Sequence, residues 1–228
     1  LGVFRSLVDH EDADPEIKAI FLQAISDLAA AGAIIVDPLE IKDFQVLSNQ
    51  IPFCGRFRYD VGQYFKSLEN PPLLDVNKVL ETGEIAPETR ASFAFYAQNP
   101  LDVVPDEWEV PCPTWPNHPE RNQLLANAIE AMDAAEVDAL IFPTWSNPPA
   151  HIELANEEYR GDNNQRLTPD AGLPAVTIPM AFWQNKLPAG LQFVGRPYAE
   201  GLLIELAYAY EQKTKHRRPP EGFGEVNE

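Results

Sequence analysis

The sequence predicts an α/β fold in which helices flank a β-sheet of at least five strands. Three observations support this fold class. The first 36 residues alternate strand-like, helical and strand-like patterns, and the second half repeats that theme. Hydrophobic residues make up 45% and charged residues 23% of 228 residues, which is ordinary for a globular chain with a sizeable core.

The first strand–helix–strand unit is well marked. Residues 1–8 (LGVFRSLV) are short and apolar, as in a buried strand. Asp14 is the expected N-cap of the following helix, Pro15 takes its first position, and the next apolar residues recur at helical spacing. Gly32 ends the helix, and residues 33–36 form the second strand. This order is typical of a crossover between parallel strands.

The middle of the chain reads as helices separated by irregular segments. Residues 59–68 and 87–97 have helical apolar spacing. Residues 99–119 contain six prolines and are expected to form a long loop, which tends to be functional or inserted.

The second half returns to helices and strands. Its expected elements are a helix at 119–135, a buried strand at 137–142, a long polar loop at 146–170, strands at 175–178 and 191–194 joined by a turn at 184–186, a helix at 200–213, and a frayed tail at 219–228. No domain boundary is evident, so residues 1–228 are expected to form a single α/β unit.

Composition and charge exclude several classes of protein. With 17 basic and 35 acidic residues the net charge is −18, which opposes binding to nucleic acid. No stretch of about 18 apolar residues predicts a membrane span. The chain starts at Leu1 without a visible signal peptide. Two cysteines, Cys54 and Cys112, favour a reducing compartment, the cytoplasm, although a single bridge between them stays open.

No catalytic centre is recognisable from the residues alone. The histidines lack metal-ligand spacing, and glycine-rich phosphate loops are missing, so neither a metal nor another cofactor is expected. No serine lies in a Gly-x-Ser-x-Gly elbow. Ser146 follows a strand end, where pocket lining or loop capping is a better interpretation than a nucleophile. We therefore assign no catalytic residue.

Several ordered stretches resemble the amidase signature family. The most specific are VDALIFPT at 137–144, TPDAGLPAVTIPM at 168–180 and LPAGLQFVGRP at 187–197, supported by 1–38, FRYDVGQYF at 57–65 and the helix at 202–215. The resemblance implies a mixed, largely parallel β-sheet covered by helices, a partial amidase-signature fold. It also implies hydrolysis of linear carboxamides to an acid and an amine or ammonia, without a metal or organic cofactor.

The family's catalytic motif is absent from this sequence. In the family, a serine attacks the amide carbonyl, a second serine relays the proton, a lysine acts as base, and a Gly-Gly-Ser-Ser-Gly-Gly loop holds the oxyanion. These residues would precede Leu1, so the resemblance implies the C-terminal portion of an amidase, inactive alone, whose partner is the missing N-terminal segment. A sheet cut in this way would expose a strand edge, so self-association or a homo-oligomer is expected.

The resemblance also implies a substrate site. Pro143, Thr144 and Trp145 at a strand end would line the pocket for the amide, and residues 162–164 (Asp162, Asn163 and Asn164) would help to orient it. Alternatively, Trp145 is only a core or rim aromatic, and Pro143 only ends its strand.

Two other functions stay open. One is a member of an amidotransferase complex that takes ammonia from glutamine for aminoacyl-tRNA. The other is a non-catalytic binding or scaffold protein.

Overall fold

The computed structural model describes residues 1–51, 54–220 and 222, which divide into two compact units. The first unit combines Leu1–Gln50 with Glu120–Glu228, and the second is Ile51–Pro119. The sequence predicted one α/β unit over 1–228, whereas the sheet and its helices make up the first unit only. The second unit is helical and bonded within itself, and helices with ordinary composition give no signal of a boundary.

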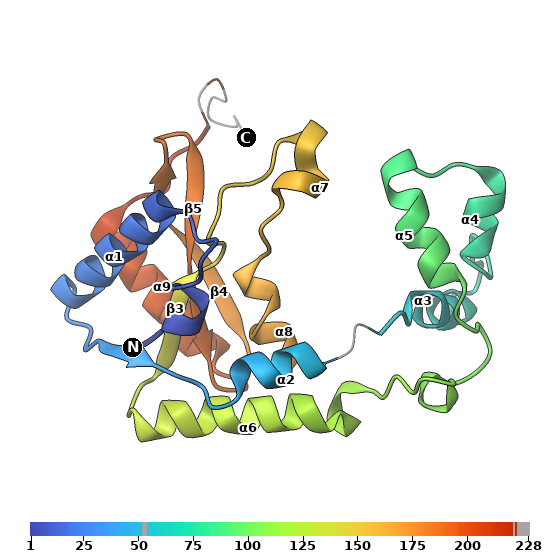
Figure 1. The fold of residues 1–228 in the computed structure, drawn as a ribbon, viewed down its shortest axis with the longest axis horizontal. Coiled ribbons are helices and arrows are strands. Elements are labelled where there is room, and N and C mark those ends of the chain that lie inside the picture. The colour runs from blue at the N-terminus through green and yellow to red at the C-terminus, as the bar shows by residue number, and fades with distance from the viewer. Residues whose placement is uncertain (52–53, 221, 223–228) are drawn as a thin grey trace. The chain divides into compact units, whose positions relative to one another are not determined.

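The sheet of the first unit has five strands in the order β2-β1-β3-β5-β4. Their bounds are β1 Gly2–Phe4, β2 Val36–Leu39, β3 Ala139–Pro143, β4 Ala175–Trp183 and β5 Leu187–Gly195. β1 pairs in parallel with β2 and β3, while β5 pairs antiparallel with β3 and β4. The predicted mixed sheet is therefore confirmed, with its parallel part at the β2-β1-β3 side (Figure 1).

Two long helices cover one face of this sheet. α1 (Pro15–Ala30) and α9 (Glu200–Thr214) lie beside each other and pack against β4 and β5 (Figure 1). Asp14 caps α1 as predicted, because its carboxylate accepts hydrogen bonds from the backbone N–H groups of Glu16 and Ile17. Tyr210 of α9 is buried edge-on against Phe193 of β5. The same unit contains α2 (Phe44–Gln50) and α6 (Pro119–Ala134).

Two predicted strands have different bounds. The first stops at Phe4, because Arg5–Leu7 forms a 3₁₀ turn. The second starts at Val36 rather than at 33, because the backbone N–H of Ala33 still bonds to the Leu28 carbonyl and so completes the end of α1. The predicted turn at 184–186 joins β4 to β5.

The two expected loops contain short helical turns. Residues 99–119 include Pro105–Glu107 and Trp115–Asn117. The loop at 146–170 includes Ile152–Leu154, α7 (Ala155–Glu158), Asn163–Gln165 and the start of α8 (Thr168–Ala171). Of the predicted frayed tail at 219–228, residues 221 and 223–228 lie outside the described part of the chain.

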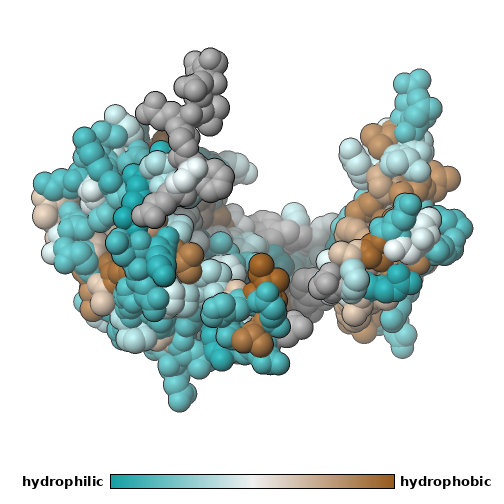
Figure 2. Space-filling view, turned by 90° about the horizontal axis from the view of Figure 1, so that it is seen from above, coloured by the Kyte–Doolittle hydropathy of each residue, from teal (hydrophilic) through white to brown (hydrophobic). Residues whose placement is uncertain are grey.

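The second unit consists of α3 (Phe57–Lys66), α4 (Asn77–Thr82) and α5 (Pro87–Ala97). Arg58 connects them through a two-pronged ion pair with Asp75 and hydrogen bonds to the carbonyls of Ala97 and Asn99. Phe95, Tyr64 and Leu74 of this unit are more than half exposed, and Figure 2 shows such hydrophobic side chains in brown at the right.

A disulfide joins Cys54 to Cys112, near the two ends of the second unit. The bridge that the sequence left open is therefore present. Disulfides persist mainly in oxidising compartments, so this bond weighs against the expected reducing compartment. Every helix in residues 1–51, 54–220 and 222 is too short or too polar to cross a lipid bilayer.

Candidate functional site

The end of β3 places a pair of hydroxyls next to β4 and β5. The Thr144 N–H donates to the Gly190 carbonyl at 2.8 Å, which holds the residue after β3 against β5. The hydroxyl oxygens of Thr144 and Thr177 then lie 3.1 Å apart. Gly190 permits this approach, because a Cβ there would lie 2.8 Å from both Thr144 Oγ1 and Thr177 Cγ2.

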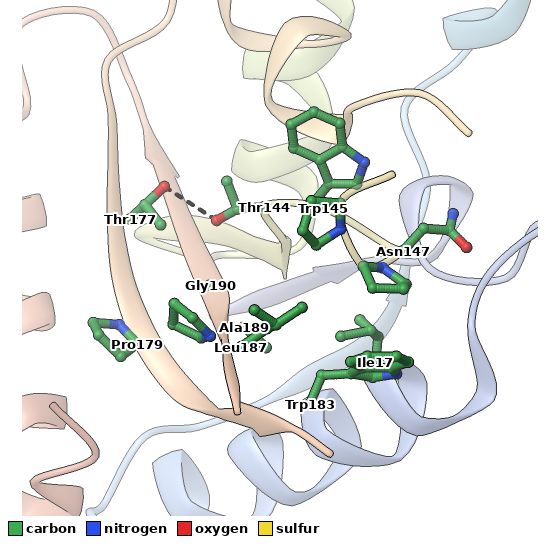
Figure 3. A pocket seen from close by; sticks show the side chains of 13 residues that line it. Ile17, Thr144, Trp145, Asn147, Thr177, Pro179, Trp183, Leu187, Ala189 and Gly190 are labelled. Atoms are coloured by element: carbon green, nitrogen blue, oxygen red, sulfur yellow. Dashed lines mark hydrogen bonds between the residues drawn. The ribbon is translucent and has the colours of Figure 1, made fainter. Parts of the chain in front are cut away.

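These hydroxyls face a pocket of about 410 Å³ (Figure 3). Its walls come from α1, the segment after β3, and the β4–β5 hairpin. The lining residues are Ile17, Thr144, Trp145, Asn147, Pro148, Pro149, Thr177, Pro179, Trp183, Leu187, Pro188, Ala189 and Gly190. Trp145 and Trp183 lie on opposite sides of this lining (Figure 3). The Trp145 ring also meets Tyr159 edge-on, with 5.9 Å between ring centroids, so it forms a supported pocket wall.

Asn163 holds the base of this site together. Its side-chain Nδ2 lies 2.7 Å from the Leu7 carbonyl oxygen, 2.9 Å from the Pro143 carbonyl oxygen and 2.6 Å from Ser146 Oγ. Asn163 and Ser146 are buried. One amide thus ties the segment after β1 to the end of β3 and to the loop that carries Trp145. Ser146 donates its own hydrogen to the Leu7 carbonyl at 3.3 Å, which fits the predicted loop capping.

Asp162 belongs to a second pocket beside the first. This pocket has a volume of about 510 Å³ and is lined by Ser6, Leu7, His10, Gln45, Tyr159, Arg160, Gly161, Asp162, Asn163, Gln165 and Arg166. Burial raises the pKa of the Asp162 carboxyl, although the hydrogen bond that it accepts from the Asn164 N–H acts in the other direction. Arg166 Nε is buried without a hydrogen-bond partner among the described residues.

The six residues predicted to bind substrate thus have different positions. Thr144 and Trp145 line the first pocket, and Asp162 and Asn163 line the second. Pro143 is buried at the end of β3, and its carbonyl accepts the Asn163 hydrogen bond. Asn164 takes part through its backbone, with its N–H bonded to the Thr144 carbonyl at 3.2 Å.

Sequence reasoning missed the contribution of the hairpin to the pocket. Thr177, Gly190 and Trp183 line it, and they come from the two strands that the sequence predicted correctly. A signal was present, because a turn at 184–186 places 177 near 192 and 179 near 190 in an antiparallel register. Within the described part of the chain, no three His, Cys, Asp or Glu side chains gather as metal ligands would.

Comparison with known proteins matches this fold to one family. The family model described as Amidase matches residues 1–204. The A-type component of the glutamyl-tRNA(Gln) amidotransferase from Thermodesulfovibrio yellowstonii is 36% identical over 225 residues, which cover 92% of this chain and 44% of that protein. The protein of the same name from a Synechococcus strain is 28% identical, over 98% of this chain and 47% of its own length. The chain therefore spans less than half of either relative.

Solved structures show the same fold. The peptide amidase from Stenotrophomonas maltophilia has a TM-score of 0.67 and 24% identity, covering 96% of this chain and 44% of that chain. An amidase family protein from Bacillus anthracis has a TM-score of 0.65 and 22% identity, covering 96% of this chain and 39% of that chain.

Proposed function

This chain belongs to the amidase family, and from that premise we propose that it forms the substrate-binding part of an amide hydrolase. The reaction adds water across the C–N bond of a linear carboxamide and releases an acid with an amine or ammonia. The observation that carries the proposal is the pocket at the end of β3, which lies within the matched residues. Thr144 and Trp145 are its proposed substrate contacts, and Asp162, Asn163 and Asn164 position them from the adjoining loop.

The proposed nucleophile and base lie outside these 228 residues. A serine would attack the amide carbonyl, a second serine would relay its proton to the leaving amine, a lysine would act as base, and water would release the acyl group. Two facts support this division. The chain spans less than half of its end-to-end relatives, and the defined hydrogen bonds from Ser6, Ser48 and Ser146 go to carboxylates or a carbonyl rather than to a base.

The decisive experiment compares this chain with the protein encoded by its complete reading frame. The nucleotide sequence upstream of Leu1 is first read for a Gly/Ser-rich stretch. Both proteins are then incubated with a panel of neutral amides, and released acid and ammonia are measured. We expect turnover by the longer protein and none by the 228-residue chain. The proposal fails if the longer protein, with its serines intact, hydrolyses no amide.

A second candidate is a component of an amidotransferase that takes ammonia from glutamine. The names of the curated relatives favour it. It predicts strict dependence on glutamine and co-purification with further protein components. With a net charge of −18, this chain would leave contact with tRNA to those partners. A non-catalytic scaffold is the outcome if the reading frame begins near Leu1.

A further inference from the structure

The pocket beside Thr144 has no charged side chain in its lining, although the chain has 52 charged residues among 228 (17 basic plus 35 acidic). Its polar side chains are the hydroxyls of Thr144 and Thr177 and the amide of Asn147. A charged ligand group placed there would lose its water without gaining an ionic partner. The lining therefore selects against charge at this end of a ligand.

The apolar walls are also flat and stiff. Four prolines (Pro148, Pro149, Pro179 and Pro188) contribute rings without rotamer freedom, and two indoles stand on opposite sides (Figure 3). Indole faces and proline rings pack well against planar or cyclic groups. Because these walls are already ordered, a rigid ligand group binds with little further loss of entropy.

One end of this apolar space is polar without being charged. The Thr144 and Thr177 hydroxyls are 3.1 Å apart, and either can be the donor, so the pair can offer an amide either a hydrogen or a lone pair. Charged side chains line an adjoining space instead, which shares Asn147, Pro148 and Trp183 with the pocket but is also lined by Asp14, Arg160 and Lys186. The apolar pocket is thus distinct from its charged surroundings.

We propose that this pocket binds a neutral aromatic or cyclic group of the amide substrate, with the uncharged amide at the Thr144–Thr177 pair. This inference rests on the proposed function, because it names the substrate class of that same site. It separates the two candidate activities, since free glutamine carries an ammonium and a carboxylate that the lining leaves unpaired.

Binding to the 228-residue chain tests the pocket without requiring catalysis. Phenylacetamide, 4-carboxyphenylacetamide and glutamine are titrated, and the intrinsic indole fluorescence is followed, with calorimetry as a second readout. We expect phenylacetamide to bind at least tenfold more tightly than the other two. Equal binding of the ring-charged analogue, or no binding of phenylacetamide, overturns the inference.

Matched variants locate the bound ligand. Gly190→Ala places a methyl group against the hydroxyl pair, whereas Gly201→Ala adds one in α9, where a Cβ meets nothing within 4 Å. Trp145→Ala removes one wall, and Trp108→Ala removes an indole from the second unit. We expect Gly190→Ala and Trp145→Ala to raise the Kd of phenylacetamide at least tenfold and the two controls to leave it unchanged. Equal effects of test and control variants refute the assignment.

The outcome also separates this inference from the proposed function. If phenylacetamide binds selectively but the longer protein hydrolyses no amide, the hydrolase proposal fails and the pocket assignment stands. If the longer protein hydrolyses amides but prefers glutamine or the ring-charged analogue, the pocket assignment fails and the hydrolase proposal stands. Since binding is compared between ligands on the unmodified chain, misfolding of a variant leaves the inference open to refutation.

Discussion

Replacing Asn163 should loosen the loop that carries Trp145 and lower the stability of the first unit. The Asn163 amide nitrogen has two hydrogens and three close acceptors, the Leu7 carbonyl, the Pro143 carbonyl and Ser146 Oγ. Asn163→Ala therefore removes two full hydrogen bonds and leaves buried acceptors without that donor. Leu7 keeps its bond from Ser146, so the Pro143 carbonyl loses most.

The magnitude follows from the cost of an unsatisfied buried acceptor, about 1–3 kcal/mol for each group. With two acceptors affected and one of them partly compensated, Asn163→Ala should lower the free energy of unfolding by about 3 kcal/mol. In a chain of this length, that loss corresponds to a fall in Tm of roughly 6–12 °C. Asn163→Asp should cost more at neutral pH, because a carboxylate would face the same acceptors.

Protonation gives the aspartate variant a distinct pH dependence. The neighbouring acceptors favour the protonated carboxyl, so the folded-state pKa of Asp at this position lies above its unfolded value. As the pH falls through that raised pKa, the carboxyl regains an O–H donor, and the deficit relative to the unmodified protein should shrink. Thermal unfolding between pH 4 and pH 7 measures this trend.

Asn164→Ala is the matched control, because the neighbouring side chain forms no hydrogen bond with the described residues while its backbone N–H bonds to Asp162 and Thr144. Its stability should stay within about 0.5 kcal/mol of the unmodified protein. The reasoning is refuted if Asn163→Ala costs no more than Asn164→Ala, or if the deficit of Asn163→Asp is the same at pH 4 and pH 7.

Three further predictions concern the frame around the site. Asp14→Ala removes the N-cap of α1 and should lower the free energy of unfolding by about 1 kcal/mol, seen as a small fall in Tm. The Arg58 hydrogen bond lowers the pKa of the Asp75 carboxyl below 3.8, so this pair stabilises the folded state above that pH and the contribution is lost as the pH falls through the folded-state pKa. Asp75→Asn should therefore flatten the acid side of the stability profile, and an unchanged profile would contradict this. Protein purified without reductant should yield no free thiol in a denaturing titration, and Cys54 and Cys112 should both react after reduction.

Local signals in the sequence predicted the elements, whereas the site depends on distant segments meeting. Asp14 and Pro15 act on their own helix, so the start of α1 could be read directly. The Asn163 network joins residues 156, 20 and 17 positions apart, and no local pattern reports such convergence. Thr144 and Trp145 were predicted because they follow a strand end, where α/β folds place ligand-binding loops.

The bridge between Cys54 and Cys112 has a consequence for how the chain can be shortened. Their Cα atoms are 5.7 Å apart, although 58 positions separate them in the sequence. About two residues of extended backbone span that distance. Residues 55–111 can therefore be exchanged for a dipeptide without pulling their flanking residues apart, which makes this segment a replaceable cassette and gives a direct route to studying the pocket-bearing unit alone.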